Sequence, residues 1–126
     1  MKAISFLKLG MFILTIWISS NSIAQDVKIA KIGNKESILF SKENGDFKFN
    51  VSGLNPEQVT KSASYYIMYF TTTYNEKSGE LTIKMVQSDA TARRVILRLF
   101  TALGIQNIES EGKIYLNSDF YDNFLQ

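Results

Sequence analysis

The chain of 126 residues contains no cysteine and no histidine. A disulfide framework, a thiolate nucleophile and a zinc or copper site built on thiolates or imidazoles each need one of these residue types, so the sequence excludes them. An imidazole general base is excluded for the same reason. The sequence also lacks a Gly-x-Ser-x-Gly nucleophile elbow. We therefore expect a protein that is not an enzyme and that carries no cofactor.

Long apolar runs are also absent, apart from a short one near the start. Lys2 and Lys8 precede about ten largely apolar residues, whereas a membrane-spanning helix needs about 20. Small and polar residues follow and end at Ser22-Ile23-Ala24, as in a secretory signal peptide. The sequence predicts that residues 1–24 are removed and that the protein is exported to the periplasm or the extracellular space. It then keeps no stable membrane span and, without cysteine, no lipoprotein anchor.

An excess of positive charge is missing from the remaining chain. The signal peptide contains two of the 14 basic residues, Lys2 and Lys8, and none of the 12 acidic ones. Residues 25–126 therefore have a formal net charge of zero, which argues against nucleic acid as a partner. Their length suits a single domain with one modest core.

Residues 47–108 form the predicted core of this domain. Phe47, Phe49 and Val51 alternate with polar residues, which is typical of a strand with one buried face. Residues 71–74 and 81–85 are predicted as a hairpin around the turn-forming residues 75–79. Residues 105–108 supply a last short strand.

Two helices are predicted between these strands. The first begins with Asn55 as the cap and Pro56 at the first helical position. The second begins at Ser88 or Asp89 and ends at Gly104. Tyr65, Met68 and Tyr69 are expected to pack at the rim of the sheet. The buried stripe of the first helix is Val59, Ala63, Tyr66, Ile67 and Phe70, and that of the second is Ala92, Val95, Ile96, Leu99 and Leu103.

The order strand, helix, two strands, helix, strand predicts an α+β fold, the ferredoxin-like βαββαβ sandwich, with both helices on one face of the sheet. Before this core, residues 27–32 and 38–40 favour strand. The pair Asn44-Gly45 predicts a hairpin between residues 38–43 and 46–51, which adds an N-terminal strand to the first core strand. After the core, residues 114–116 favour strand and Asn117-Ser118-Asp119 is a candidate cap. A short C-terminal helix with Phe120, Tyr121, Phe124 and Leu125 on one face is then predicted.

The central stretch resembles a heavy-metal-associated domain, the small domain of copper chaperones and metal-transporting ATPases. The resemblance runs from Phe47-Lys48-Phe49-Asn50-Val51-Ser52-Gly53-Leu54 through the helix and the hairpin to Leu103-Gly104-Ile105. It implies a ferredoxin-like fold. The family binds its metal through two cysteines in a Gly-Met-x-Cys-x-x-Cys loop, and here Pro56 and Val59 stand at the cysteine positions. Since neither side chain binds a metal ion, the resemblance argues against the family's activity.

Few side chains remain as candidates for binding. Met68 and Met85 are the soft metal ligands after signal removal, and we interpret them as core filler, so no metal site is assigned. One possible partner surface consists of the basic cluster and the aromatic C-terminal helix: Arg93, Arg94, Arg98, Phe120, Tyr121 and Phe124. The alternative for the arginines is a solvated helix face, and for the aromatic helix it is packing on the domain.

These observations favour a small exported binding module that contacts another protein of the cell envelope or a secreted protein. The alternative is a degenerate heavy-metal-associated domain that retains weak metal-ion binding. Nucleic acid is not an expected partner.

Overall fold

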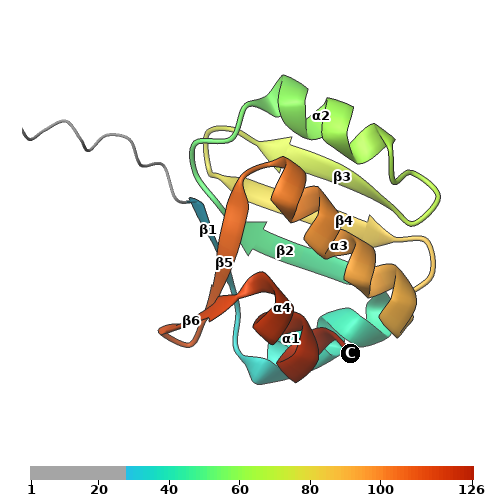
Figure 1. Ribbon diagram of the computed structural model, residues 1–126, viewed down its shortest axis with the longest axis vertical. Coiled ribbons are helices and arrows are strands. Elements are labelled where there is room, and N and C mark those ends of the chain that lie inside the picture. Colours follow the sequence, from blue (N-terminus) through green and yellow to red (C-terminus); the bar gives the residue numbers. More distant parts are fainter. Residues whose placement is uncertain (1–27) are drawn as a thin grey trace, which may run out of the picture.

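The computed structural model describes residues 28–126, so the predicted signal peptide, residues 1–24, lies outside the described part. The chain forms a mixed α+β fold with one six-stranded sheet (Figure 1). The strands are β1 (Lys28–Ile32), β2 (Asp46–Asn50), β3 (Phe70–Asn75), β4 (Glu80–Met85), β5 (Ile105–Ser110) and β6 (Lys113–Leu116). The helices are α1 (Lys35–Asn44), α2 (Pro56–Ser64), α3 (Ala90–Ala102) and α4 (Asn117–Phe120), followed by a π-helical turn, η5 (Tyr121–Leu125).

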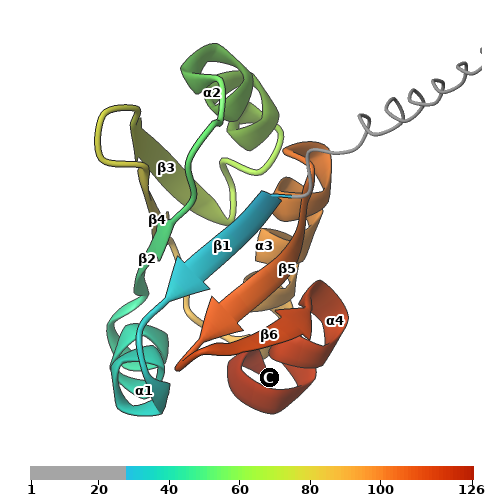
Figure 2. The same cartoon turned by 90° about the vertical axis from the view of Figure 1, so that its left-hand side faces the viewer.

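The strands lie in the order β3-β4-β2-β1-β5-β6. β1 is antiparallel to β2 and parallel to β5, while β2–β4, β3–β4 and β5–β6 are antiparallel pairs. A simple ferredoxin-like sheet would place β5 directly beside β2. Figure 2 shows β1 between them, so the strand order differs from the predicted one.

The predicted hairpin at Asn44-Gly45 is wrong, because residues 35–44 form helix α1. Asn34 caps its start by accepting a hydrogen bond from Ser37 N at 2.9 Å. Gly45 ends it with φ 76°, and its N–H donates to Ser41 O at 2.7 Å. A glycine with positive φ serves both as a hairpin turn residue and as a helix terminator, and here the helix terminates. The added strand that pairs with β2 is β1 instead.

Helices α2 and α3 pack over one face of the sheet, as predicted (Figure 1). Asn55 caps α2 by accepting from Glu57 N at 2.9 Å, and Asp89 caps α3 by accepting from Ala92 N at 2.8 Å. Phe49 and Phe100 meet edge to face with ring centroids 4.9 Å apart. The largest fully buried side chains of this core are Phe47, Phe49, Phe70, Phe100, Phe120, Ile38, Leu81, Ile83, Ile96, Leu99, Ile105 and Ile108.

The opposite face of the sheet carries mainly polar side chains where β3, β4 and β2 lie side by side. Lys48, Thr71, Thr73 and Lys84 are exposed there. α1 and α4 both lie at one end of the sheet (Figures 1 and 2), where α1 contacts η5 and Lys42 Nζ donates to Gln126 O at 3.1 Å. Within residues 28–126, no helix is long and apolar enough to cross a membrane.

Candidate functional site

The connection between α2 and β3 consists of five consecutive apolar residues, Tyr65–Tyr69. The sequence predicted that the helix would continue to Phe70, but α2 ends at Ser64 and Phe70 opens β3. Tyr66 N bonds to Ala63 O at 2.9 Å, so the chain tightens out of the helix at this point. The last turn of the predicted helix is therefore a turn that leads directly into an edge strand.

Backbone hydrogen bonds fix this turn. Tyr69 N and Phe70 N both donate to Tyr66 O, at 2.8 and 3.1 Å. Below it, the half-buried Tyr66 packs on the fully buried Phe70, with ring centroids 6.0 Å apart. The turn is thus anchored through Tyr66, and its other side chains need not take part in the core.

Those other side chains face solvent. The exposed fraction is 75% for Tyr65, 63% for Ile67, 83% for Met68 and 41% for Tyr69. The rim packing predicted for Tyr65, Met68 and Tyr69 is therefore not what the structure shows. Isolated exposed apolar residues are ordinary, but a continuous group of large ones marks a surface where another molecule can bind.

Val86 extends the same surface from the end of β4. Its N–H donates to Tyr69 O at 2.9 Å, and its side chain is 67% exposed. We call Tyr65–Tyr69 together with Val86 the apolar turn. It borders two hollows in the surface. One of about 230 Å³ reaches from Met68 to Thr91, and one of about 270 Å³ lies between α2 and β3.

The turn also lies in an uncharged part of the chain. Between Lys61 and Glu76 no residue carries a charge. Approach of an apolar partner therefore removes no ionised side chain of this segment from water, which would otherwise oppose binding.

The residues of the predicted partner surface are divided between the interior and the surface. Arg93 is only 7% exposed, and its Nε donates to Leu125 O at 2.6 Å. Its Nη1 donates to Ser88 O at 2.8 Å. Arg93 therefore joins the start of α3 to the end of the chain, which is a structural role.

Arg94 and Arg98 are exposed on α3. The Arg94 guanidinium lies over the Tyr121 ring, 5.0 Å from its centroid. Such a contact holds the outer face of η5 against the helix. Arg98 differs from Arg93 and Arg94. Within residues 28–126 its side chain makes neither a hydrogen bond nor an aromatic contact.

The aromatic residues of the C-terminal helix pack on the domain. Phe120 is 0% and Tyr121 5% exposed, and the Tyr121 hydroxyl donates to Ala90 O at 2.9 Å. Phe124 is half-buried, with its ring edge-on to Tyr115 at 5.3 Å. Contact of Phe120 with a partner would require this helix to leave the domain.

Within residues 28–126 the structure gathers no cluster of metal ligands. Among residues 28–126 there is no group of three or more acidic side chains that could hold an ion. Met68 is exposed and Met85 packs against the core. A soft metal ion would therefore find no enclosed sulfur site in this part of the chain.

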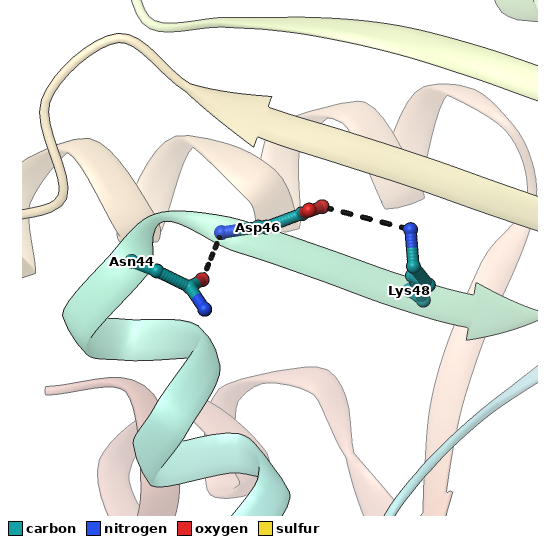
Figure 3. A network of polar contacts seen from close by, with 3 residues as sticks. All are labelled: Asn44, Asp46 and Lys48. Atoms are coloured by element: carbon teal, nitrogen blue, oxygen red, sulfur yellow. Dashed lines mark hydrogen bonds and ion pairs between the residues drawn. The ribbon is translucent and has the colours of Figure 1, made fainter.

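One small polar group lies at the start of β2 (Figure 3). Asn44 Oδ1 accepts from Asp46 N at 2.9 Å, and Lys48 Nζ lies 3.9 Å from Asp46 Oδ1. The Lys48 side chain is 56% exposed, and an ion pair so open to water contributes little to stability. The group closes the turn between α1 and β2.

Comparison of the chain with family models, with curated proteins and with solved structures finds no match in any of the three.

The sequence contains signals of an apolar excess in the apolar turn, but it does not identify which of these side chains are exposed. A helix that packs on a sheet buries one face, yet residues 65–70 are apolar without interruption. Such a run contains more apolar side chains than one helix face can bury. The absence of charge between Lys61 and Glu76 is a second signal of the same kind.

Proposed function

We propose that this chain is a non-enzymatic binding module that contacts another protein of the cell envelope through the apolar turn. The observation that carries the proposal is the exposure of four large apolar side chains within five consecutive residues, 65–69. Tyrosine and methionine are enriched in protein interfaces, because they offer a large contact area together with a polar or polarisable group. The location in the envelope depends on the predicted signal peptide.

The anchoring of the turn supports this function. Its backbone is already fixed by the bonds to Tyr66 O, so binding would order only the side chains. A partner then avoids the entropy cost of folding a loop. A partner that fits this surface has an apolar, uncharged groove or patch of its own.

We also propose that the segment from β2 to β5 is a ferredoxin-like unit widened by β1. Its elements follow the order βαββαβ, and leaving β1 out of the strand order would put β5 beside β2. In this interpretation β1 and α1 are additions that precede the unit in the chain.

The test is site-specific photo-crosslinking in the envelope of the host. A photoreactive phenylalanine at Met68 is compared with the same residue at Phe40, which is 65% exposed on α1. We expect a discrete crosslinked protein from position 68 and none from position 40. A tag belongs directly after residue 24, because the predicted signal peptide is removed and because Arg93 and Lys42 bind the carbonyl groups of Leu125 and Gln126 at the other end.

A pair of double variants provides the control. Tyr65→Ser with Met68→Ser removes two exposed apolar side chains from the turn, and Leu39→Ser with Phe40→Ser removes two from α1. We expect the first pair to lower capture of the crosslinked protein at least about tenfold and the second to leave it unchanged. Equal capture by both, or a loss with the α1 pair alone, contradicts the proposal.

A further inference from the structure

β3 is an edge strand, and the backbone geometry identifies which of its groups are free. Tyr69 O accepts from Val86 N, and the pairs continue as Thr71 with Lys84 and Thr73 with Thr82. In an antiparallel ladder, every second residue directs its N–H and C=O at the neighbouring strand. Thr71 and Thr73 therefore bond to β4.

The alternate residues, Phe70, Thr72 and Tyr74, direct their backbone groups at the free edge. Phe70 N is already used, because it donates to Tyr66 O at 3.1 Å. The groups left for another strand are the C=O of Phe70 and both the N–H and C=O of Thr72 and Tyr74. They form a regular row of donors and acceptors along one edge of the sheet.

This edge lacks the features that normally prevent strand addition. β3 has six residues, Phe70–Asn75, with neither a charged residue nor a proline among them. The opposite edge strand, β6, has four residues, begins with Lys113 and runs straight into α4. Short length and a charged residue protect an edge, so β6 is protected and β3 is not.

We propose that β3 pairs with β3 of a second copy of this chain, antiparallel and about a two-fold axis at Thr72. Thr72 then exchanges N–H···O=C bonds with the partner's Thr72. Tyr74 N–H donates to the C=O of the partner's Phe70, and by symmetry the partner's Tyr74 N–H donates to the C=O of Phe70. The two sheets become one continuous sheet, and the interface is isologous.

The polar face of β3 favours its own copy as the occupant. In this register Thr71 lies directly opposite the partner's Thr73, and threonine pairs across neighbouring strands are favourable. No charged side chain of β3 meets a like charge, since the strand has none.

The charges on β4 do not oppose this pairing, and both β3 strands separate them from β4 of the partner. Lys84 lies beside Thr71 at one end of β3, and Glu80 lies beside Asn75 at the other. Antiparallel pairing brings the Lys84 end of one copy to the same end of the joined sheet as the partner's Glu80. The hollow of about 270 Å³ along this edge, lined in part by Ala63 and Ile67, would then face the same hollow of the partner.

Charged side chains introduced on the exposed face of β3 test this pairing. In the purified chain from residue 25, Thr71→Lys with Thr73→Lys places like charges opposite each other on the exposed face, and Thr71→Glu with Thr73→Glu does the same with the other sign. Ile114→Lys with Leu116→Lys is the matched control, because these side chains are 57% and 59% exposed on the opposite edge strand. Sedimentation velocity measures the dimer dissociation constant of each variant, and circular dichroism checks that each one folds.

We expect the wild-type chain to dimerise with a dissociation constant below about 1 mM. For each β3 variant alone, we expect this constant to be at least about tenfold larger. An equal mixture of the lysine and glutamate variants should form dimers again, more weakly at high salt, and the β6 control should behave as wild type. A monomeric wild type at that concentration, a lysine variant that dimerises as wild type, or a mixture without heterodimers would overturn the proposal. Loss of the dimer with Met68→Ser but not with the β3 variants would assign the interface to the apolar turn and overturn it as well.

Discussion

Two aromatic segments of this chain have similar composition and opposite surroundings. Residues 65–69 contain three tyrosines, an isoleucine and a methionine, and residues 120–125 contain two phenylalanines, a tyrosine and a leucine together with Asp122 and Asn123. In the first segment four of five side chains face solvent, while in the second Phe120, Tyr121 and Leu125 are buried. Composition alone therefore does not decide whether an aromatic segment is core or contact surface.

The difference lies in what holds each segment. The C-terminal segment is held at several points by polar groups with buried partners, chiefly Arg93 Nε to Leu125 O and the Tyr121 hydroxyl to Ala90 O. The apolar turn is held through its own backbone and through Tyr66. In the C-terminal segment the hydrogen bonds fix apolar side chains in the interior. In the apolar turn the backbone hydrogen bonds leave the apolar side chains exposed to solvent.

The largest expected effect comes from replacing one aromatic side chain in each segment. Phe120→Ala removes a side chain that is 0% exposed and should lower the free energy of unfolding by about 3–5 kcal/mol. Tyr65→Ala, at 75% exposed, should change it by less than about 0.5 kcal/mol. Urea unfolding followed by circular dichroism measures both. Similar losses in the two variants would show that the turn is part of the core.

The next effect concerns the buried arginine. Arg93→Met keeps most of the apolar stem but removes the donors to the buried Leu125 O and the part-buried Ser88 O, which leaves both acceptors without this partner. We expect a loss of about 2–4 kcal/mol, seen as a lower thermal midpoint. Arg94→Met, which removes only the contact over Tyr121, should cost less than about 1 kcal/mol. If the two arginines proved equivalent, the link between α3 and the end of the chain would not be structural.

The smallest effect tests a single hydroxyl. Tyr121→Phe loses the bond to Ala90 O and should lower stability by about 1 kcal/mol. Tyr69→Phe, in the exposed turn, is the matched change and should be neutral within about 0.5 kcal/mol. Hydrogen exchange of the amides of residues 117–126 gives a second readout, since it should accelerate in the first variant and not in the second.

Much of the fold could be predicted from local sequence. The alternation of Phe47 and Phe49, the caps Asn55 and Asp89, and Gly104 at the end of α3 all hold in the structure. These signals are local, because each depends on a few neighbouring residues. The α+β class followed from their order.

The failures came from positions where local sequence allows two outcomes. Gly45 with positive φ fits a hairpin and a helix end equally well, and the choice depends on Ile38 finding a place in the core. The position of β1 between β2 and β5 depends on contacts far apart in the sequence, which periodicity does not encode.

The candidate site was harder to predict for a related reason. An exposed and a buried aromatic residue look the same in a sequence, and only the covering elements distinguish Tyr65 from Phe120. Arg93, whose Nε holds the C-terminal segment through Leu125 O, lies 32 positions from that residue in the chain.

The central place of β1 also has a consequence for the timing of folding. β1 is the first described strand, and its parallel partner β5 comes near the other end of the chain. Ser110, for example, donates to Gly33 O across 77 positions. Loops of this length close slowly, and the sheet cannot be completed until β5 is available. A chain that emerges amino end first, from a ribosome or through a membrane, would therefore complete its sheet only after β5 has emerged, late in its passage.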